Sequence, residues 1–142
     1  MRRILSGAAI MALAISPAVA RDQVIPAEVE GQVEFITPSG NVGCTYTPKG
    51  GTATYQPSGD GPELICERVE PTYVTMVMGP GGLVKRINNP GEQGCCSDRP
   101  KLAYGNSWSS GPFSCSSAAA GLNCNGPGGH GFFVSRNRIT QR

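Results

Sequence analysis

His130 is the only histidine of the chain, and it lies between two glycines shortly before two phenylalanines. A serine hydrolase would use its imidazole as the general base, with Ser114 or Ser135 as nucleophile and Asp98 as third member. No GxSxG elbow accompanies these residues. We therefore expect His130 to fix a turn through hydrogen bonds, and we assign no catalytic residue.

Metal and cofactor chemistry has little to draw on in this sequence. Zinc normally takes three or four His, Cys or carboxylate ligands, and a single histidine makes such a set improbable. The glycine-rich run 126–131 precedes a β-rich stretch, whereas phosphate-binding loops lead into a helix. We expect neither a metal site nor a cofactor.

Cys115 and Cys124 flank residues 116–120, and this pattern predicts a β-hairpin with one cysteine on each strand. Facing positions of an antiparallel pair bring Cα atoms within disulfide reach. We predict a Cys115–Cys124 disulfide.

The other four cysteines allow three pairings. Two long-range bonds would avoid the small ring that the adjacent Cys95 and Cys96 close when they pair with each other. Alternatively, Cys44 and Cys66 lie on neighbouring β segments and could pair locally, which leaves Cys95 and Cys96 for each other. The sequence leaves both arrangements open, and the structural interpretation of the adjacent pair is favoured over a redox-labile one.

Aromatic residues gather in the stretch from Leu102 to Arg136 and could stack on sugar rings, with Arg136 and Asn125 as polar partners. In a small core such residues are more often buried. The candidate binding residues are Tyr104, Trp108, His130 and Arg136.

The first twenty residues have the pattern of a secretory signal peptide. Arg2 and Arg3 form a positive start, an apolar stretch follows from Ile4 to Ile15, and a small-x-small motif ends at Ala20. We predict cleavage between Ala20 and Arg21, and export to the periplasm or the medium. The apolar stretch is shorter than the roughly 20 residues of a membrane span, and we expect no transmembrane segment in the mature chain.

Removal of the first 20 of 142 residues also removes the excess positive charge, which comes from Arg2 and Arg3. A balanced exported chain gives no support for a nucleic-acid partner. The acids concentrate before residue 71 and the bases after it, so the two halves could pair within one domain. Alternatively, Arg136, Arg138 and Arg142 could form a basic face for an anionic surface polymer.

The mature chain is the length of one domain, and its six cysteines favour a covalent framework over disorder. Short β-rich segments alternate with Gly/Pro turns, and no window has helical periodicity. The predicted strands are 32–37, 42–47, 52–56, 63–69, 72–78 and 83–87, with a hairpin over residues 42–56 and a polar loop over 88–100. We expect a small all-β, disulfide-stabilised antiparallel sandwich or open barrel over residues 32–136, between an extended leader (21–31) and a basic C-terminal tail (137–142).

Five strings occur in order along the chain: SGNVGC (39–44), LAYGNSW (102–108), GPFSC (111–115), GLNC (121–124) and GHGFFVSR (129–136). Together they resemble a family of small exported bacterial proteins known as domain of unknown function 6636. The resemblance implies export and a compact disulfide-bonded domain, and it supplies no established activity. The chain departs from the family in the middle, where residues 78–90 contain no cysteine and Cys95–Cys96 occurs instead. The family's disulfide pattern is therefore not carried over to this pair.

Three function classes fit these observations. The leading hypothesis is a non-enzymatic envelope or secreted module, structural or binding, whose partner is an envelope glycan or another exported protein. The alternative is an inhibitor of a cell-wall hydrolase, which rests on architecture alone. The third is a hydrolase that uses His130.

Overall fold

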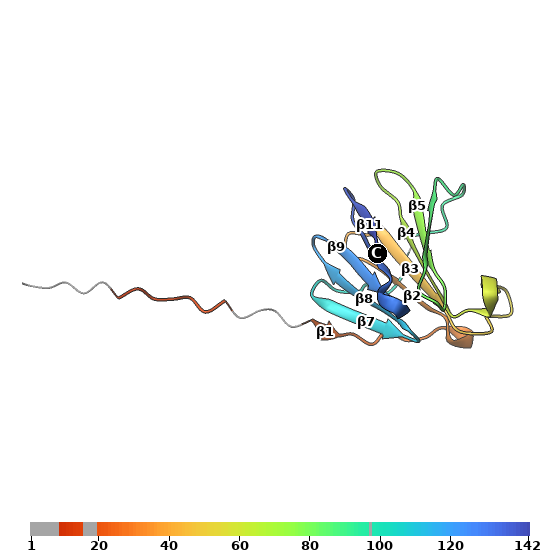
Figure 1. Cartoon of the computed structure of the whole chain (residues 1–142), viewed down its shortest axis with the longest axis horizontal. Coiled ribbons are helices and arrows are strands. Elements are labelled where there is room, and N and C mark those ends of the chain that lie inside the picture. The colour runs from red at the N-terminus through yellow and green to blue at the C-terminus, as the bar shows by residue number, and fades with distance from the viewer. Residues whose placement is uncertain (1–8, 16–19, 97) are drawn as a thin grey trace, which may run out of the picture.

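The computed structural model describes residues 9–15, 20–96 and 98–142. Two β-sheets pack face to face, and short 3₁₀ turns are the only helical elements of the described part (Figure 1). The five-stranded sheet contains β2 (Val33–Ile36), β3 (Val42–Thr47), β4 (Glu63–Arg68), β5 (Val74–Met78) and β6 (Val84–Asn88) in sequence order. The six-stranded sheet has the order β1 (Arg21–Asp22), β7 (Asn106–Ser110), β8 (Phe113–Ala118), β9 (Gly121–Asn125), β10 (Gly131–Val134) and β11 (Ile139–Gln141). The 3₁₀ turns are η1 (Val29–Gly31), η2 (Ser58–Asp60) and η3 (Pro127–Gly129). The predicted all-β sandwich is confirmed.

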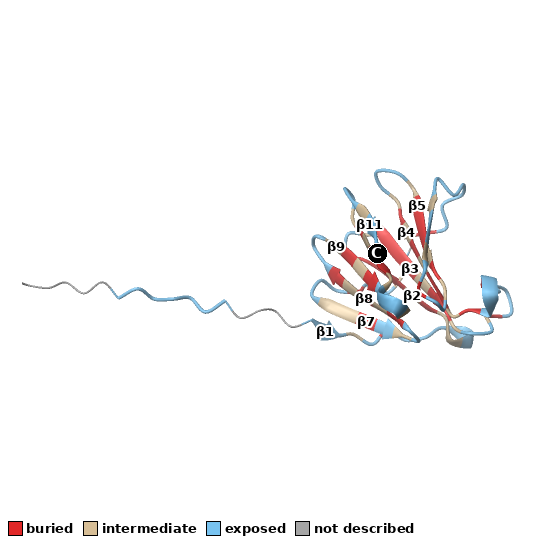
Figure 2. Cartoon of the chain, viewed as in Figure 1, coloured by how far each residue is buried: buried red, intermediate tan, exposed pale blue. Residues whose placement is uncertain are grey.

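Alternation along the strands places the core between the sheets. In β8, Phe113, Cys115 and Ser117 are buried while Ser114 and Ser116 are less so, as expected for a strand with one face on the core. Figure 2 shows buried residues on strands of both sheets and exposed residues in the loops. Successive strands pair antiparallel in each sheet, and β1 alone pairs parallel, with β7.

Two buried disulfides lie at the centre of the sandwich. Cys44 faces Cys66 on β3 and β4, and Cys115 faces Cys124 on β8 and β9. The sulfur atoms of Cys44, Cys66 and Cys124 lie within 4.8 Å of one another, so the two bonds pack together between the sheets. The predicted Cys115–Cys124 bond is confirmed, and the structure has the local pairing for the rest: Cys44–Cys66 and Cys95–Cys96.

An aromatic cluster fills the core beside the disulfides. The ring centroids of Phe35 and Trp108 are 5.0 Å apart, and Tyr46 meets Trp108 at 5.9 Å and Phe113 at 6.2 Å. The Phe35, Tyr46 and Trp108 rings come from both sheets, so the cluster joins them.

The predicted hairpin over residues 42–56 is wrong. Residues 52–56 form no strand, and β3 pairs with β4 instead. Thr52 turns the chain, because its N–H donates to the carbonyl of Tyr55 at 2.8 Å and its Oγ1 accepts from the Tyr55 N–H at 3.1 Å. The Tyr55 hydroxyl then donates to Glu63 at 2.5 Å, which ties this loop to the start of β4.

Both ends of the predicted mature chain join the fold. Arg21–Asp22 of the expected leader pairs with β7, and Ile25 is buried. The expected tail contains β11, which pairs with β10. The sheet therefore extends beyond the predicted boundaries at residues 32 and 136. Pairing at its edges satisfies backbone N–H and C=O groups, and the sequence pattern alone does not reveal this pairing.

The expected signal peptide lies partly outside the described residues, including Arg2, Arg3 and the motif before Ala20. Of its apolar stretch, Ile10, Met11, Leu13 and Ile15 are described and almost fully exposed. Among the described residues, no helix has the length and hydropathy that a membrane span requires.

Candidate functional site: a hollow at one end of the sandwich

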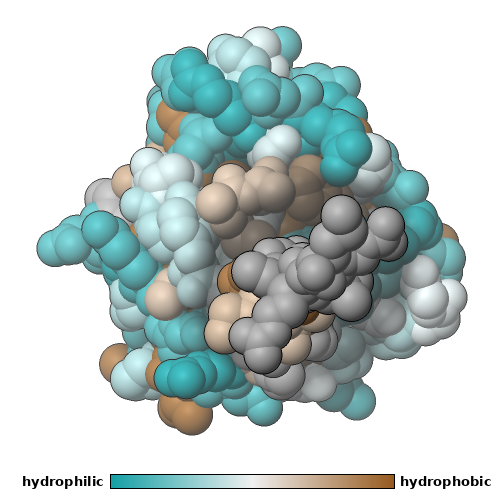
Figure 3. Space-filling view, turned by 90° about the vertical axis from the view of Figure 1, so that its left-hand side faces the viewer, coloured by the Kyte–Doolittle hydropathy of each residue, from teal (hydrophilic) through white to brown (hydrophobic). Residues whose placement is uncertain are grey.

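Three turns from both sheets meet at one end of the sandwich and surround a hollow of about 380 Å³. The β2–β3 turn, the β8–β9 turn and the β10–β11 turn contribute most of the lining, and Tyr104 completes it. We call this the end hollow. Its residues are Thr37, Ser39, Asn41, Val42, Tyr104, 118–122 and 134–137. Figure 3 shows the end of the molecule where β1 begins. This end is mainly hydrophilic, with a small apolar group near its middle.

The β2–β3 turn is shaped by its own polar side chains. The Gly40 N–H donates to the Thr37 carbonyl at 2.9 Å, and Gly40 has the positive φ of 76° that glycine adopts most easily. Asn41 makes two hydrogen bonds to Glu70 in the β4–β5 turn. Its Nδ2 donates to the Glu70 carbonyl at 3.0 Å, and its Oδ1 accepts from the Glu70 N–H at 2.7 Å. The rim of the end hollow is therefore a fixed turn with hydroxyl and amide groups.

The β10–β11 turn is held by a buried cation. Arg68 is 6% exposed and faces inward from the end of β4. Its Nη1 donates to the carbonyls of Ser135 at 3.2 Å and Arg136 at 3.5 Å, and its Nε and Nη2 donate to Thr72. No carboxylate pairs with Arg68 among the described residues. Burial lowers its pKa, and the charge of Arg86 lowers it further.

These contacts give the end hollow an electropositive side. The Arg68 guanidinium lies directly behind the turn, and the side chain of Arg136 on the same turn is exposed. A cation without a carboxylate partner beneath a concave surface makes the local electrostatic potential more positive, which attracts anions. The arrangement can hold a carboxylate or another anionic group at Arg136.

Tyr104 supplies the aromatic side of the end hollow. It is 48% exposed, the most exposed tyrosine of the described residues. The neighbouring turn is fixed, because the Gly105 N–H donates to the Ser117 carbonyl at 2.8 Å and the Asn106 N–H to the Ala103 carbonyl at 3.0 Å. A partly exposed ring on a fixed turn can pack against the apolar face of a ligand, and the backbone loses no conformational entropy on binding because it is already ordered.

The four predicted binding residues do not form one site. Tyr104 and Arg136 both line the end hollow. Trp108 does not line the end hollow: it is only 3% exposed and packs in the aromatic cluster. The core of a two-sheet sandwich needs large apolar rings from both sheets, and Trp108 fills this role.

His130 lies at the opposite end of β10 from the hollow. His130 holds this turn through hydrogen bonds, as expected, and the bonds are made by its backbone: the N–H donates to the Pro127 carbonyl at 3.4 Å, and the carbonyl accepts from the Gly126 N–H at 2.9 Å. Strand β10 separates His130 from Ser135 by about 16 Å, too far for a base and its nucleophile.

The remaining basic residues have separate partners. Arg138 lies over the ring of Phe133, 4.9 Å from its centroid, and Arg142 donates to the Cys124 carbonyl at 3.1 Å and to Asn125. Of the expected basic face, only Arg136 lines the end hollow. Asn125, expected as a ligand partner, is already bonded to Arg142.

Sequence reasoning missed several residues of the hollow. Ser39 and Asn41 belong to a stretch that indicates only a turn, and Asn137 was assigned to the tail. Arg68 is an isolated charge on a strand, and nothing local in the sequence shows that it faces inward. The clustered sulfur atoms of Cys44, Cys66 and Cys124 are in disulfides and offer no thiolate to a metal.

The fold and the hollow define a small disulfide-bonded β-sandwich with one concave, polar end. No family model, curated protein or solved structure matches this chain. The resemblance to the family of unknown function stays a prediction.

Proposed function

We propose that this chain is an exported, non-enzymatic binding module that takes an anionic glycan at the end hollow. The observation that carries the proposal is the meeting of exposed Tyr104 and exposed Arg136 on one concave surface rimmed by hydroxyl and amide groups. Ligand sites are typically concave, with an apolar contact and a few convergent polar groups.

The chemistry of the lining favours an acidic sugar chain. An aromatic ring packs against the apolar face of a sugar, while Ser39, Asn41 and Asn137 offer donors and acceptors for its hydroxyl groups. Arg136 suits a carboxylate, because its guanidinium can form two parallel hydrogen bonds with the two oxygens. Arg68 keeps the turn in place and adds positive potential from behind.

Export is supported by two independent features. Disulfides persist in oxidising compartments, and this chain has three of them and no free cysteine among its described residues. The apolar residues from Ile10 to Ile15 are exposed, as expected for a segment that is removed rather than packed in the domain.

The test is retention of the oxidised protein on peptidoglycan and on a uronic-acid polysaccharide, with a neutral glucan as control. We expect retention on the acidic glycans and its decrease with salt, because a charge contact contributes. Tyr104→Ala and Arg136→Gln should each weaken binding about tenfold, as expected for loss of one stacking contact or one charge-assisted bond.

Arg138→Gln is the matched control, since it removes the same charge from a residue that packs over Phe133 outside the hollow. His130→Gln controls for the opposite end of β10. Equal losses for Arg136→Gln and Arg138→Gln would show binding by bulk charge and contradict the proposed site. A stoichiometric complex with a lysozyme-like enzyme, with no glycan retention, would favour the inhibitor alternative instead.

A further inference from the structure

A second feature lies on the outer face of the five-stranded sheet, away from the core. Residues Gly94–Cys96, here the cystine segment, cross this face with their disulfide directly over Gly43 of β3. A Cβ built on Gly43 would overlap Cys95 Sγ and lie 2.9 Å from Cys96 Sγ. Gly43 points away from the core and is nevertheless buried, because the sulfur atoms cover it.

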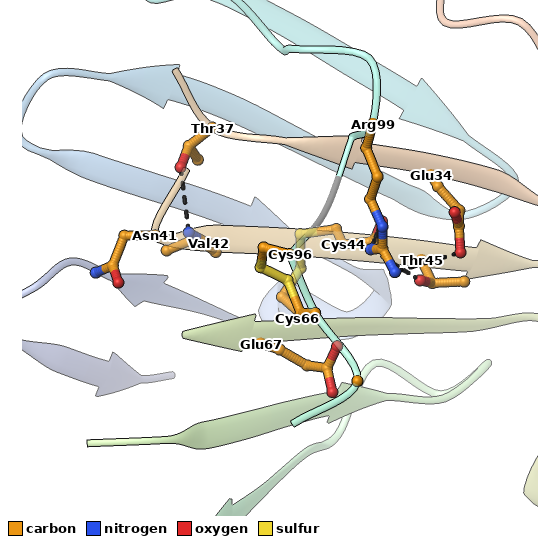
Figure 4. The surroundings of a disulfide bond; sticks show 12 residues. Glu34, Thr37, Asn41, Val42, Cys44, Thr45, Cys66, Glu67, Cys96 and Arg99 are labelled. Atoms are coloured by element: carbon orange, nitrogen blue, oxygen red, sulfur yellow. Dashed lines mark hydrogen bonds and ion pairs between the residues drawn. A yellow bond between two sulfur atoms is a disulfide. The ribbon is translucent and has the colours of Figure 1, made fainter. Parts of the chain in front are cut away.

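Polar contacts anchor the chain on both sides of this disulfide. On one side, the Gly94 N–H donates to the Tyr73 hydroxyl at 3.0 Å, and that hydroxyl donates to Glu67. On the other, Arg99 Nη1 donates to the Cys44 carbonyl and to Thr45 Oγ1, both at 3.3 Å. Figure 4 shows the Arg99 side chain reaching across to β3, where its guanidinium lies beside Thr45 and Glu34, with Glu67 on the other side of Cys96.

The Cys95–Cys96 bond restricts the unfolded chain much less than the two core disulfides do. A disulfide stabilises chiefly because it closes a loop in the denatured state, and longer loops give more. The two core disulfides join residues 22 and 9 positions apart, whereas Cys95 and Cys96 are neighbours. Loop closure therefore accounts for the core bonds and leaves the adjacent pair without a stabilising role of this kind.

Exposure also separates the three bonds. All four core cysteines are 0–1% exposed between the sheets, so a reductant reaches them only when the sandwich opens. Cys96 is partly exposed on a surface segment, and the neighbouring Gly94 is exposed. Thiol–disulfide exchange requires direct attack on a sulfur atom, so access decides which bond reacts.

We propose that Cys95–Cys96 is a thiol–disulfide exchange site for dithiol reductants. A thiolate of the dithiol attacks Cys96 Sγ, the Cys95–Cys96 bond breaks, and its electron pair goes to Cys95 Sγ. The second thiol of the reductant then attacks the mixed disulfide and releases Cys96. The products are the oxidised reductant and two protein thiols, with both protons supplied by the dithiol. Arg99 lies over Gly43 together with the two sulfur atoms, so its positive charge stabilises the leaving thiolate of Cys95. The ion pair with Glu34 neutralises part of that charge.

The experiment exposes the oxidised protein to increasing dithiothreitol without denaturant, then traps thiols with N-ethylmaleimide and maps them by mass spectrometry. We expect two labels, on Cys95 and Cys96, to appear at least about tenfold faster than any label on a core cysteine. On removal of the reductant, the pair should close again within one chain, and the reduced pair should bind phenylarsine oxide one to one.

Cys95→Ser/Cys96→Ser is the matched control and should lose the fast labels and the arsenical binding while the core bonds stay intact. First labels on Cys44 or Cys115, or six labels that appear together, would overturn the proposal. So would reduced protein that remains as a mixed disulfide or joins a second chain instead of closing. Glycan retention plays no part in these readouts, so this test stands apart from that of the end hollow.

Discussion

Removal of the three disulfides one at a time gives the sharpest test of how the fold is held. Each variant replaces one pair by alanines while the other two bonds stay oxidised. The variants are Cys44→Ala/Cys66→Ala, Cys115→Ala/Cys124→Ala and Cys95→Ala/Cys96→Ala. Because the three bonds join residues 22, 9 and 1 positions apart, they differ mainly in the loop that each closes.

The chain-entropy model turns these separations into free energies. Closing the 22-residue loop contributes about 3.4 kcal/mol and the 9-residue loop about 2.6 kcal/mol, whereas the adjacent pair closes only the small ring of two neighbouring residues. Alanine also leaves a small cavity in the core. All four core cysteines are 0–1% exposed, so this cost is similar for both core pairs and largely cancels in their difference. We expect the Cys44–Cys66 variant to be less stable than the Cys115–Cys124 variant by about 0.8 kcal/mol.

The assay is equilibrium unfolding in urea, followed by the fluorescence of Trp108, which is buried in the native state. Midpoints and slopes together report the free energy of unfolding, and unchanged slopes show that the denatured states are comparable. The reasoning is refuted if the Cys95–Cys96 variant loses as much stability as either core variant. It is also refuted if the Cys115–Cys124 variant is the least stable of the three.

Two further outcomes follow from side-chain contacts. Gly43→Ala should lower the free energy of unfolding of the oxidised protein by about 1–3 kcal/mol, because the new methyl group meets the cystine sulfur atoms. In a Cys95→Ala/Cys96→Ala background the same substitution should cost little. Equal losses in both backgrounds, measured by urea unfolding, would contradict the contact. Burial, followed by the hydrogen bond and charge of Glu63, raises the pKa of Tyr55 to about 12. The unfolded value is about 10, so the folded state keeps this proton longer, and its contribution to stability is present below pH 10 and lost between about pH 10 and 12. Glu63→Gln should return the phenolate titration of Tyr55 toward 10, and an unmoved titration would show that Glu63 does not act on it.

The parts of the fold that follow local pattern were predictable. The hairpin with Cys115 and Cys124 could be predicted because two cysteines flank a short turn, and facing positions of a hairpin match disulfide geometry. The strands over residues 33–36, 63–68 and 74–78 could be predicted because apolar and β-branched residues concentrate there.

What failed depends on partners far away in the sequence. Residues 52–56 have the composition of a strand, but β4 pairs with β3 in their place. The Tyr55 hydroxyl donates a hydrogen bond to Glu63 of β4 instead. Strand β7 is rich in serine and was missed, because its pairing with β8 and β1 rather than its composition makes it a strand. The exposure of Tyr104 and the burial of Trp108 could not be separated, since both are aromatic residues of one short stretch.

Strand β3 shows why one sequence pattern serves three purposes at once. Its side chains alternate between the faces of the sheet, so three consecutive residues have three different surroundings. Val42 lines the end hollow, Gly43 on the opposite face lies beneath the cystine segment, and Cys44 returns to the core and bonds Cys66. Each requirement restricts one position: an apolar wall, a residue without Cβ and a cysteine. The string Val42–Gly43–Cys44 is therefore the point where the hollow, the exchange site and the covalent core constrain one another, and a register shift of β3 by one residue would disrupt all three.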